Sequence, residues 1–328
     1  MATAPTNTRE TYGAICIRED LANIIYNISP TDTPFMSGCG KESCDNTYFE
    51  WQTDALVAAA ANRRVEGIDP DSIAVSEPTR VGAYTQISTT TVQTSGTAEA
   101  VDFAGRRSSQ AYQLAKRAKE MKRDMEKMLM DNVGRNAGAA PTGSPLAGTA
   151  RISGGLGAWV ATNYHTLGSG SPSPAAGSGN GVTAAVDAPT TATITEVGIK
   201  QVIKECFDSG GSPDTVLVGS ANKQTISGLT QTVSELRTAA NKVSPASVIA
   251  AVDVYVSDFG VFKIVPDRFQ RSRDAWFVDF DFFSIAYLRN FATETLAKTG
   301  DSIKQMLVAE YGLKVKNEAS SGFLADLS

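Results

Sequence analysis

The chain has 328 residues, of which 42% are hydrophobic and 20% charged, and its formal net charge is −5 at pH 7. This composition supports a large core, argues against disorder, and disfavours a protein whose whole surface wraps nucleic acid, since such a surface is basic. The N-terminus lacks a basic stretch before an apolar run, and no window reaches the roughly 18 apolar residues of a membrane span. We therefore expect a chain made in the cytosol that contacts no membrane.

Cysteine and histidine are too sparse to suggest metal or hydrolytic chemistry. Cys39 and Cys44 lack CxxC spacing, and Cys16 and Cys206 lie far from them. His165, the single histidine, falls in a Gly/Ser/Pro-rich stretch that is poorly suited to orient a catalytic base. We predict reduced thiols, no catalytic residue, no metal site and no cofactor.

The N-terminal third predicts an extended arm followed by a long hairpin. Residues 1–46 contain many breakers and little periodicity. Alternating patterns predict strands over 47–54 and 80–94. The segment between them is interrupted by Gly67, Pro70 and Pro78, which predicts an irregular tip. A two-stranded hairpin has too little core to be stable alone, so it needs a partner surface.

The strongest predicted helix covers 106–132, with Ser108 or Ser109 as its cap. Its narrow apolar stripe favours core packing and consists of Ala111, Leu114, Ala118, Met121, Met125 and Met128. Its charged face contains three candidate i,i+4 ion pairs, Lys116–Glu120, Lys122–Glu126 and Lys127–Asp131.

Residues 134–193 are rich in Gly, Ala, Ser and Pro. The part from 167 to 191 is interpreted as a flexible insertion that a short linker could replace. Its GSGNG neither follows a predicted strand nor opens a helix, so it is not a dinucleotide loop.

Regular structure returns from residue 195. The patterns predict a helix ending at Gly210, a buried strand at 215–219, a helix at 220–229 and a hairpin over 248–266. The Gly219–Ser220 junction precedes a helix N-terminus and could hold an anion. Because no Lys or second Gly accompanies it, a plain strand–helix connection is favoured.

Two long strands are predicted near the C-terminus. Residues 275–291 contain Asp279 and Asp281, which would share one face of a strand. Paired carboxylates suit acid–base catalysis, but a half-buried strand with a polar side explains them more simply. Residues 302–317 alternate over a length of about 46 Å at about 3.3 Å per residue.

Several segments together resemble the major capsid (major head) proteins of tailed bacteriophages. TPFMSGCGK and NTYFEWQTDALVAAAANRRVEG, within 33–67, resemble their arm and loop, and 104–132 resembles their long helix. VPDRF (265–269), YLRNF (287–291) and 296–320 resemble their C-terminal segment.

This resemblance implies an α+β chain with the Hong Kong 97-like capsid fold. The regions it implies are an N-arm at 1–46, an extended E-loop at 47–90, a P-domain part at 91–163 with a spine helix at 106–134, an insertion at 164–194, an A-domain at 195–270, and P-domain strands with the C-terminus at 271–328.

The resemblance also implies a structural protein that assembles in many copies into an icosahedral head around a double-stranded DNA genome. Implied partners are the chain itself in hexamers and pentamers, a separate scaffolding protein, a portal, a decoration or cement protein, and packaged DNA bound without sequence preference. The implied location is the virion, after assembly in the host cytoplasm.

Two residue sets follow from this interpretation. Intersubunit contacts are expected at the E-loop tip from Arg63, Arg64, Glu66, Asp69 and Asp71. Packing of the spine helix is expected from Leu114, Met121, Met125 and Met128.

Two alternatives stay open from the sequence. A bacterial encapsulin would share the fold but enclose protein cargo. An α/β enzyme would use Asp279 and Asp281 or the Gly-rich segment.

Overall fold

The computed structural model of the chain describes most of its residues. The described residues are 30–67, 69, 75, 77–103, 105–139, 148–239 and 253–328. They form a four-stranded, a six-stranded and a two-stranded sheet. Helices and strands are both abundant, as the α+β prediction requires.

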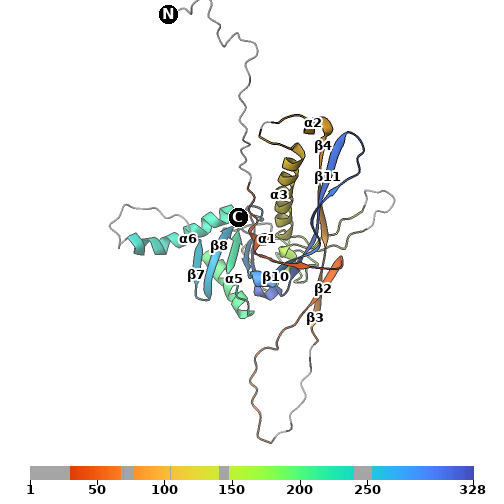
Figure 1. The fold of residues 1–328 in the computed structure, drawn as a ribbon. Coiled ribbons are helices and arrows are strands. Elements are labelled where there is room, and N and C mark those ends of the chain that lie inside the picture. Colours follow the sequence, from red (N-terminus) through yellow and green to blue (C-terminus); the bar gives the residue numbers. More distant parts are fainter. Residues whose placement is uncertain are drawn as a thin grey trace, which may run out of the picture.

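The four-stranded sheet has the order β1-β10-β11-β4 and forms the tall part of the molecule (Figure 1). Its strands are β1 (Gly40–Ser43), β4 (Gln86–Ser95), β10 (Phe283–Thr295) and β11 (Ser302–Val315). Strand β1 runs parallel to β10, and the other pairs are antiparallel. The long predicted strand 302–317 is therefore present as β11, at the centre of the sheet.

Helix α3 (Ser109–Leu129) runs along this sheet and packs against β4 and β11 (Figure 1). It is shorter than the predicted 106–134, because the Ser108 hydroxyl accepts a hydrogen bond from the Ala111 amide and caps the helix there. The short helix α2 (Gly96–Ala100) follows β4. Two further short helices are α1 (Pro34–Gly38) and α4 (Leu156–Trp159).

The six-stranded sheet has the order β5-β12-β9-β6-β8-β7. Its strands are β5 (Tyr164–Thr166), β6 (Thr215–Val218), β7 (Val254–Ser257), β8 (Gly260–Pro266), β9 (Ala275–Val278) and β12 (Gly322–Ala325). Helix α5 (Glu196–Asp208) packs on β12, and α6 (Ser220–Ala239) contacts β8. The predicted helix, strand, helix and β7–β8 hairpin are confirmed, although α6 is longer than expected.

The two-stranded sheet pairs β2 (Tyr48–Thr53) with β3 (Thr79–Tyr84), antiparallel, with Tyr48 opposite Tyr84. The segment beyond it projects from the body (Figure 1). The predicted strand 80–94 is thus divided at Thr85: its first part pairs with β2, and its second part, β4, pairs with β11. Strand β11 supplies the partner that the sequence did not reveal.

The predicted strand 275–291 is also divided, which corrects the interpretation of Asp279 and Asp281. A 3-10 turn over Phe280–Phe282 separates β9 from β10. The Asp279 carboxylate accepts a hydrogen bond from the Asp281 amide at 3.1 Å and caps this turn. The two carboxylates therefore do not share a strand face.

The segment 164–194 is packed into the body, so the interpretation of its part 167–191 as flexible is wrong. Residues 164–166 form β5 of the six-stranded sheet, and β-bridges join Ser169 to Thr190 and Ala175 to Val186. Ala188 is 1% exposed. The small residues permit close packing: a Cβ added at Gly177 would lie 2.4 Å from the Gly157 carbonyl oxygen.

We expect Gly177→Ala to lower the free energy of unfolding by about 1–3 kcal/mol, because a methyl group there clashes with fixed backbone. Gly300→Ala is the matched control, since a Cβ at Gly300 meets nothing within 4 Å. Urea unfolding of the unassembled chain measures both variants. Equal stability of the two would contradict the packed arrangement of this segment.

Candidate assembly surfaces

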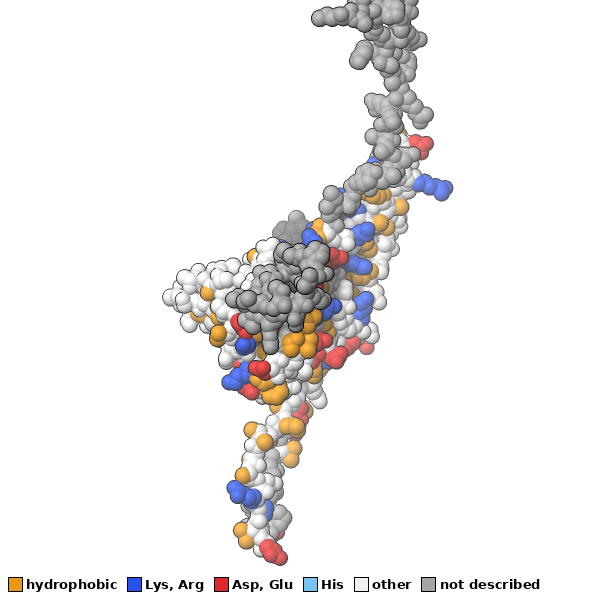
Figure 2. Space-filling view, turned by 90° about the vertical axis from the view of Figure 1, so that its left-hand side faces the viewer, with side chains coloured by type: hydrophobic (Ala, Val, Ile, Leu, Met, Phe, Trp, Pro, Cys, Tyr) orange, Lys and Arg blue, Asp and Glu red, His pale blue; other side chains and the backbone are white. Residues whose placement is uncertain are grey.

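The projecting hairpin is the largest surface without an internal core. The side chains of Leu56, Val57 and Val65 are 100%, 87% and 76% exposed, and Figure 2 shows the hairpin extending from the body as a narrow arm. Burying such apolar side chains is favourable by about 1.5–3 kcal/mol each. The hairpin therefore presents surface that another chain can cover.

Most of the predicted tip residues lie on this exposed segment. Arg63, Arg64, Glu66 and Asp69 are all exposed and form no ion pair with described residues. Asp71 lies outside the described residues. The charged groups of the tip are thus available to partners beyond the chain.

The hairpin is fixed to the body at its base by a buried carboxylate. Glu310 of β11 is 3% exposed. Its Oε1 accepts hydrogen bonds from Thr85 Oγ1 at 3.0 Å and Arg151 Nη2 at 2.5 Å, and its Oε2 accepts one from Arg289 Nε at 2.9 Å. Thr85 is the residue between β3 and β4, so Glu310 holds the point at which the hairpin leaves the sheet.

Aromatic packing stabilises the same base. The rings of Phe49 and Trp51 lie 5.8 Å apart, and Trp51 lies 5.5 Å from Trp159 of α4. On the opposite face, Tyr48 and Tyr84 are 4.7 Å apart. The base is therefore ordered by the body, whereas the tip is exposed.

Helix α3 buries part of its predicted stripe. Met121 and Met125 are 3% and 0% exposed, and Leu114 is half-buried. Met128 is 42% exposed, which corrects the prediction for that residue. Near its C-terminal end the helix buries Glu126 and Leu129 instead, because α1 packs against that side.

Glu126 connects two segments of the fold, a role that the sequence did not reveal. It is 0% exposed, and its two carboxylate oxygens accept hydrogen bonds from the amides of Phe35 and Met36 at 2.7 and 2.8 Å. These amides belong to the first turn of α1. Glu126 therefore joins the N-terminal segment to α3 rather than pairing with Lys122.

The other charged pairs predicted on α3 are also absent among the described residues. The ion pair that the helix does contain is Arg117–Glu120, at 2.7 Å. Lys122 instead lies over the ring of Phe291, 5.9 Å from its centroid.

A third surface lies on the edge of the six-stranded sheet. Strand β7 is the outer strand, and its Val254 and Val256 are 52% and 72% exposed. Phe207 and Phe259, 58% and 46% exposed, pack together at 4.8 Å between ring centroids. An open strand edge beside apolar side chains favours contact with another chain.

The residues considered for catalysis form no hydrogen-bonded group in the described part of the chain. His165 lies in β5 and makes no hydrogen bond to Asp279 or Asp281, whose contact is the cap of the 3-10 turn, and the Gly219–Ser220 junction is a strand–helix connection. Within the described ranges, no group of three or more His, Cys, Asp or Glu residues could hold a metal ion. No described helix is long and apolar enough to span a membrane.

Comparison with known proteins decides between the open alternatives. The family model described as SU10 major capsid protein matches residues 4–328. The chain belongs to the SU10 major capsid protein family. It is a structural capsid protein, as the resemblance implied.

Relatives and solved structures agree with this assignment. The major capsid protein of Escherichia phage Phieco32 is 28% identical over 92% of each chain. The cyanophage A-1(L) capsid has a TM-score of 0.62 at 11% identity, covering 95% of this chain and 97% of that one. The Mycobacterium phage Adephagia structure has a TM-score of 0.59 at 12% identity, covering 98% of each chain. The Hong Kong 97-like fold is therefore confirmed.

The encapsulin alternative has weaker support. The SrpI encapsulin from Synechococcus elongatus has a TM-score of 0.53 at 11% identity, covering 96% of this chain and 97% of that one. This likeness shows a shared fold alone. The family match places this major capsid protein with the phage proteins.

We expect Met125→Asp to yield insoluble chain, because it buries an unpaired carboxylate. Met128→Asp is the matched control on the same helix and should stay soluble, since Met128 is 42% exposed. The soluble fraction after expression and circular dichroism distinguish the two. A soluble, folded Met125→Asp variant would show that α3 faces the core differently.

Stability should also depend on the ionisation of Glu126. Burial raises the pKa of Glu126 from 4.5 to about 7, despite the two amide hydrogen bonds that lower it. A raised folded-state pKa gives stability that is fully present below pH 4.5 and is lost as the pH rises through about 7. We expect a loss of about 3 kcal/mol from this group.

Urea unfolding of the unassembled chain across this pH range measures the effect. Glu126→Gln should remove this part of the pH dependence, and Glu66→Gln, on the exposed hairpin, should retain it. Burial likewise raises the pKa of Asp274 to about 7, so part of the dependence should persist in Glu126→Gln. An unchanged profile in Glu126→Gln would contradict the role of this carboxylate.

Proposed function

We propose that this chain closes an icosahedral head from hexamers and pentamers of itself, with the projecting hairpin lying on a neighbouring subunit. The observation that carries the proposal is the arm itself: it exposes Leu56 and Val57 almost fully and has no core of its own. An element of this kind is stable only against a partner. In a symmetric shell, every copy both supplies an arm and receives one.

We propose the regions that the resemblance implies, with the same residue bounds. Residues 1–46 act as the N-arm, 47–90 as the E-loop and 195–270 as the A-domain. Residues 91–163 and 271–328 form the P-domain, with α3 as its spine. The region 164–194 is retained as a structural part of the body rather than as an appendage.

Charged contacts at the tip are proposed to set the register between neighbours. Arg63 and Arg64 of one copy face Glu66, Asp69 or Asp71 of another. Each exposed pair contributes only about 0.2–1 kcal/mol. Many symmetric copies make such weak contacts effective together.

The partners of the shell are proposed by family analogy. They are a separate scaffolding protein, a portal, a decoration or cement protein, and packaged double-stranded DNA bound without sequence preference. Assembly takes place in the host cytoplasm, and the chain performs no enzymatic reaction. The support for a purely structural role is membership of a capsid protein family.

Deleting residues 56–77 should leave a folded chain that cannot close shells, because the described residues of this segment are exposed and contribute nothing to the core. Circular dichroism and thermal melting should match the full chain, and electron microscopy should show no closed particles. Normal particles from this variant would contradict the proposed E-loop.

A milder pair of variants tests the tip charges. Arg63→Glu with Arg64→Glu should raise the protein concentration needed for assembly, because it places like charges opposite each other. Arg63→Lys with Arg64→Lys keeps the charge and is the matched control. Light scattering measures the onset of assembly, and an equal onset for both variants would exclude the proposed pairing.

A further inference from the structure

Helix α3 concentrates positive charge in an acidic chain. It carries six Lys or Arg residues against three Asp or Glu residues, whereas the whole chain has a net charge of −5. One of the three acidic residues, Glu126, is buried and faces α1. The outer face of α3 is therefore strongly basic.

Four of these cations form one stripe, which we call the α3 cationic stripe: Lys116, Lys119, Arg123 and Lys127. Their spacing of three, four and four residues keeps them on one side of a helix. Figure 2 shows Lys and Arg side chains following one another over the upper part of the molecule, where Figure 1 places α3. From first to last the stripe is about 16 Å long at about 1.5 Å per residue.

The cations of the stripe are available for an external partner. Lys116, Lys119 and Lys127 are exposed and form no ion pair with any described residue. The Arg123 guanidinium lies over the Phe269 ring, 5.3 Å from its centroid, which fixes its position without neutralising its charge. Repulsion among these cations is relieved when they meet an anionic surface.

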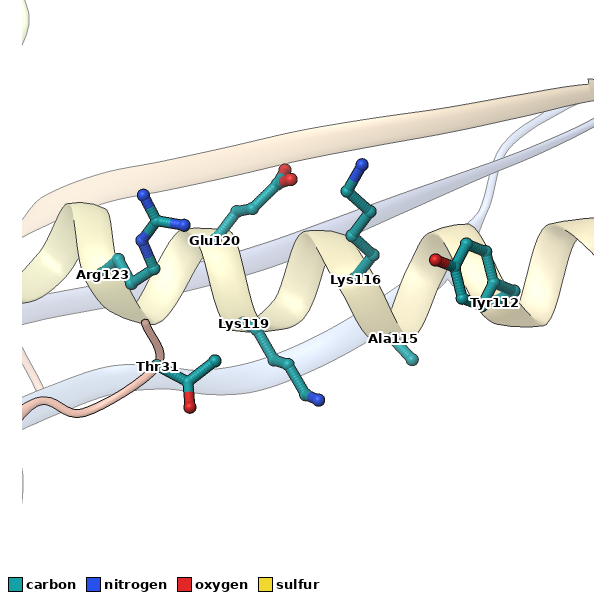
Figure 3. Close-up of a pocket in the computed structure, with 7 residues that line it drawn as sticks. All are labelled: Thr31, Tyr112, Ala115, Lys116, Lys119, Glu120 and Arg123. Carbon is teal, nitrogen blue, oxygen red and sulfur yellow. The ribbon is translucent and has the colours of Figure 1, made fainter. Parts of the chain in front are cut away.

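Acidic groups beside the stripe do not cancel it. Glu120 is half-buried and is bound by Arg117 at 2.7 Å. Asp124 is exposed at the edge. A shallow groove is lined by Lys116, Lys119 and Arg123 of the stripe, together with Glu120 and Thr31. Figure 3 shows Glu120 between Lys116 and Arg123 on one side of α3, and Lys119 on the other side with Thr31.

We propose that the α3 cationic stripe is the surface through which each subunit contacts the phosphate backbone of double-stranded DNA. This proposal rests on the proposed function, in which the shell encloses DNA, and it assigns that contact to one helix. A duplex carries one negative charge per about 1.7 Å of axis, so the length of duplex along a roughly 16 Å stripe carries about nine phosphate charges, more than the four cations need.

The lining of the groove favours DNA over an acidic protein helix. Recognition of a helix in a groove depends on apolar anchors, and Tyr112 and Ala115 are the apolar side chains that line this groove. Lysine and arginine at regular spacing contact phosphates without reading bases. Binding is therefore independent of sequence and sensitive to salt.

This assignment agrees with the acidic composition of the chain. A few contacts per subunit give weak binding, and many subunits in a shell give binding that is collectively useful yet reversible. The rest of the surface, being acidic, holds the duplex away.

The test measures binding of the unassembled full-length chain to a short mixed-sequence duplex over a range of salt concentrations. Four phosphate contacts predict a slope of log affinity against log salt of about −3.6, since each contact contributes about −0.9. The triple variant Lys116→Gln, Lys119→Gln, Lys127→Gln should reduce the slope to about −0.9. At low salt its affinity should fall by about 1000-fold.

The matched control is Lys204→Gln, Lys263→Gln, Lys298→Gln, which removes the same charge from exposed lysines elsewhere. It should keep the wild-type slope. Equal losses in both triple variants, or an unchanged slope in the stripe variant, would overturn the proposal. So would a stripe variant that keeps its DNA affinity but no longer binds polyglutamate, since that result would identify an acidic protein partner.

Electron microscopy of the same variants separates failure of this inference from failure of the proposed function. Both triple variants leave the core intact and should assemble as the wild type does. If wild-type chain forms no shells even when it is produced together with its scaffolding protein, the proposed function fails. If the stripe variant alone fails to assemble, the stripe is a contact between copies of the chain, and the assignment to DNA is wrong.

Discussion

The body of the molecule depends on the burial of Glu310 with a full set of hydrogen-bond donors. Its carboxylate joins β11 to the start of β4, to β10 and to the segment before α4, through Thr85, Arg289 and Arg151. A buried charge without such partners would cost several kcal/mol. The direction in which the hairpin leaves the sheet is therefore set by electrostatics inside the body, while the described residues of its tip are exposed.

Sequence periodicity predicted the elements whose two faces differ in polarity. The strand at β11, the hairpin β7–β8 and helix α5 follow from alternation or helical spacing. The division of 275–291 was missed because the Asp279 cap looks like the polar side of a strand. The segment 164–194 was misinterpreted because small residues indicate either a loose linker or a backbone packed closely on its neighbours, and composition alone does not distinguish the two.

Predictions of site residues failed where a distant segment decides burial. The predicted burial of Met121 and Met125 was correct, because the sheet covers that side of α3 along its length. The predicted burial of Met128 was wrong. At the C-terminal end of α3, α1 packs against the side that carries Glu126, and Met128 lies outside this contact. The partners of Glu126 are about 90 residues away, so a local reading assigned it to Lys122. Arg63, Arg64, Glu66 and Asp69 are exposed as expected, and their contacts with other copies of the chain stay a prediction.

The chain thus combines a closely packed core with exposed surfaces. Trp276 and Phe323 stack 3.9 Å apart in the core, and both are at most 1% exposed. The exposed hairpin, the β7 edge and the cationic stripe are open surfaces of the part of the chain that the structure describes. In the proposed shell, each of these narrow surfaces makes a weak contact, and association becomes strong because many symmetric copies make the same contacts together.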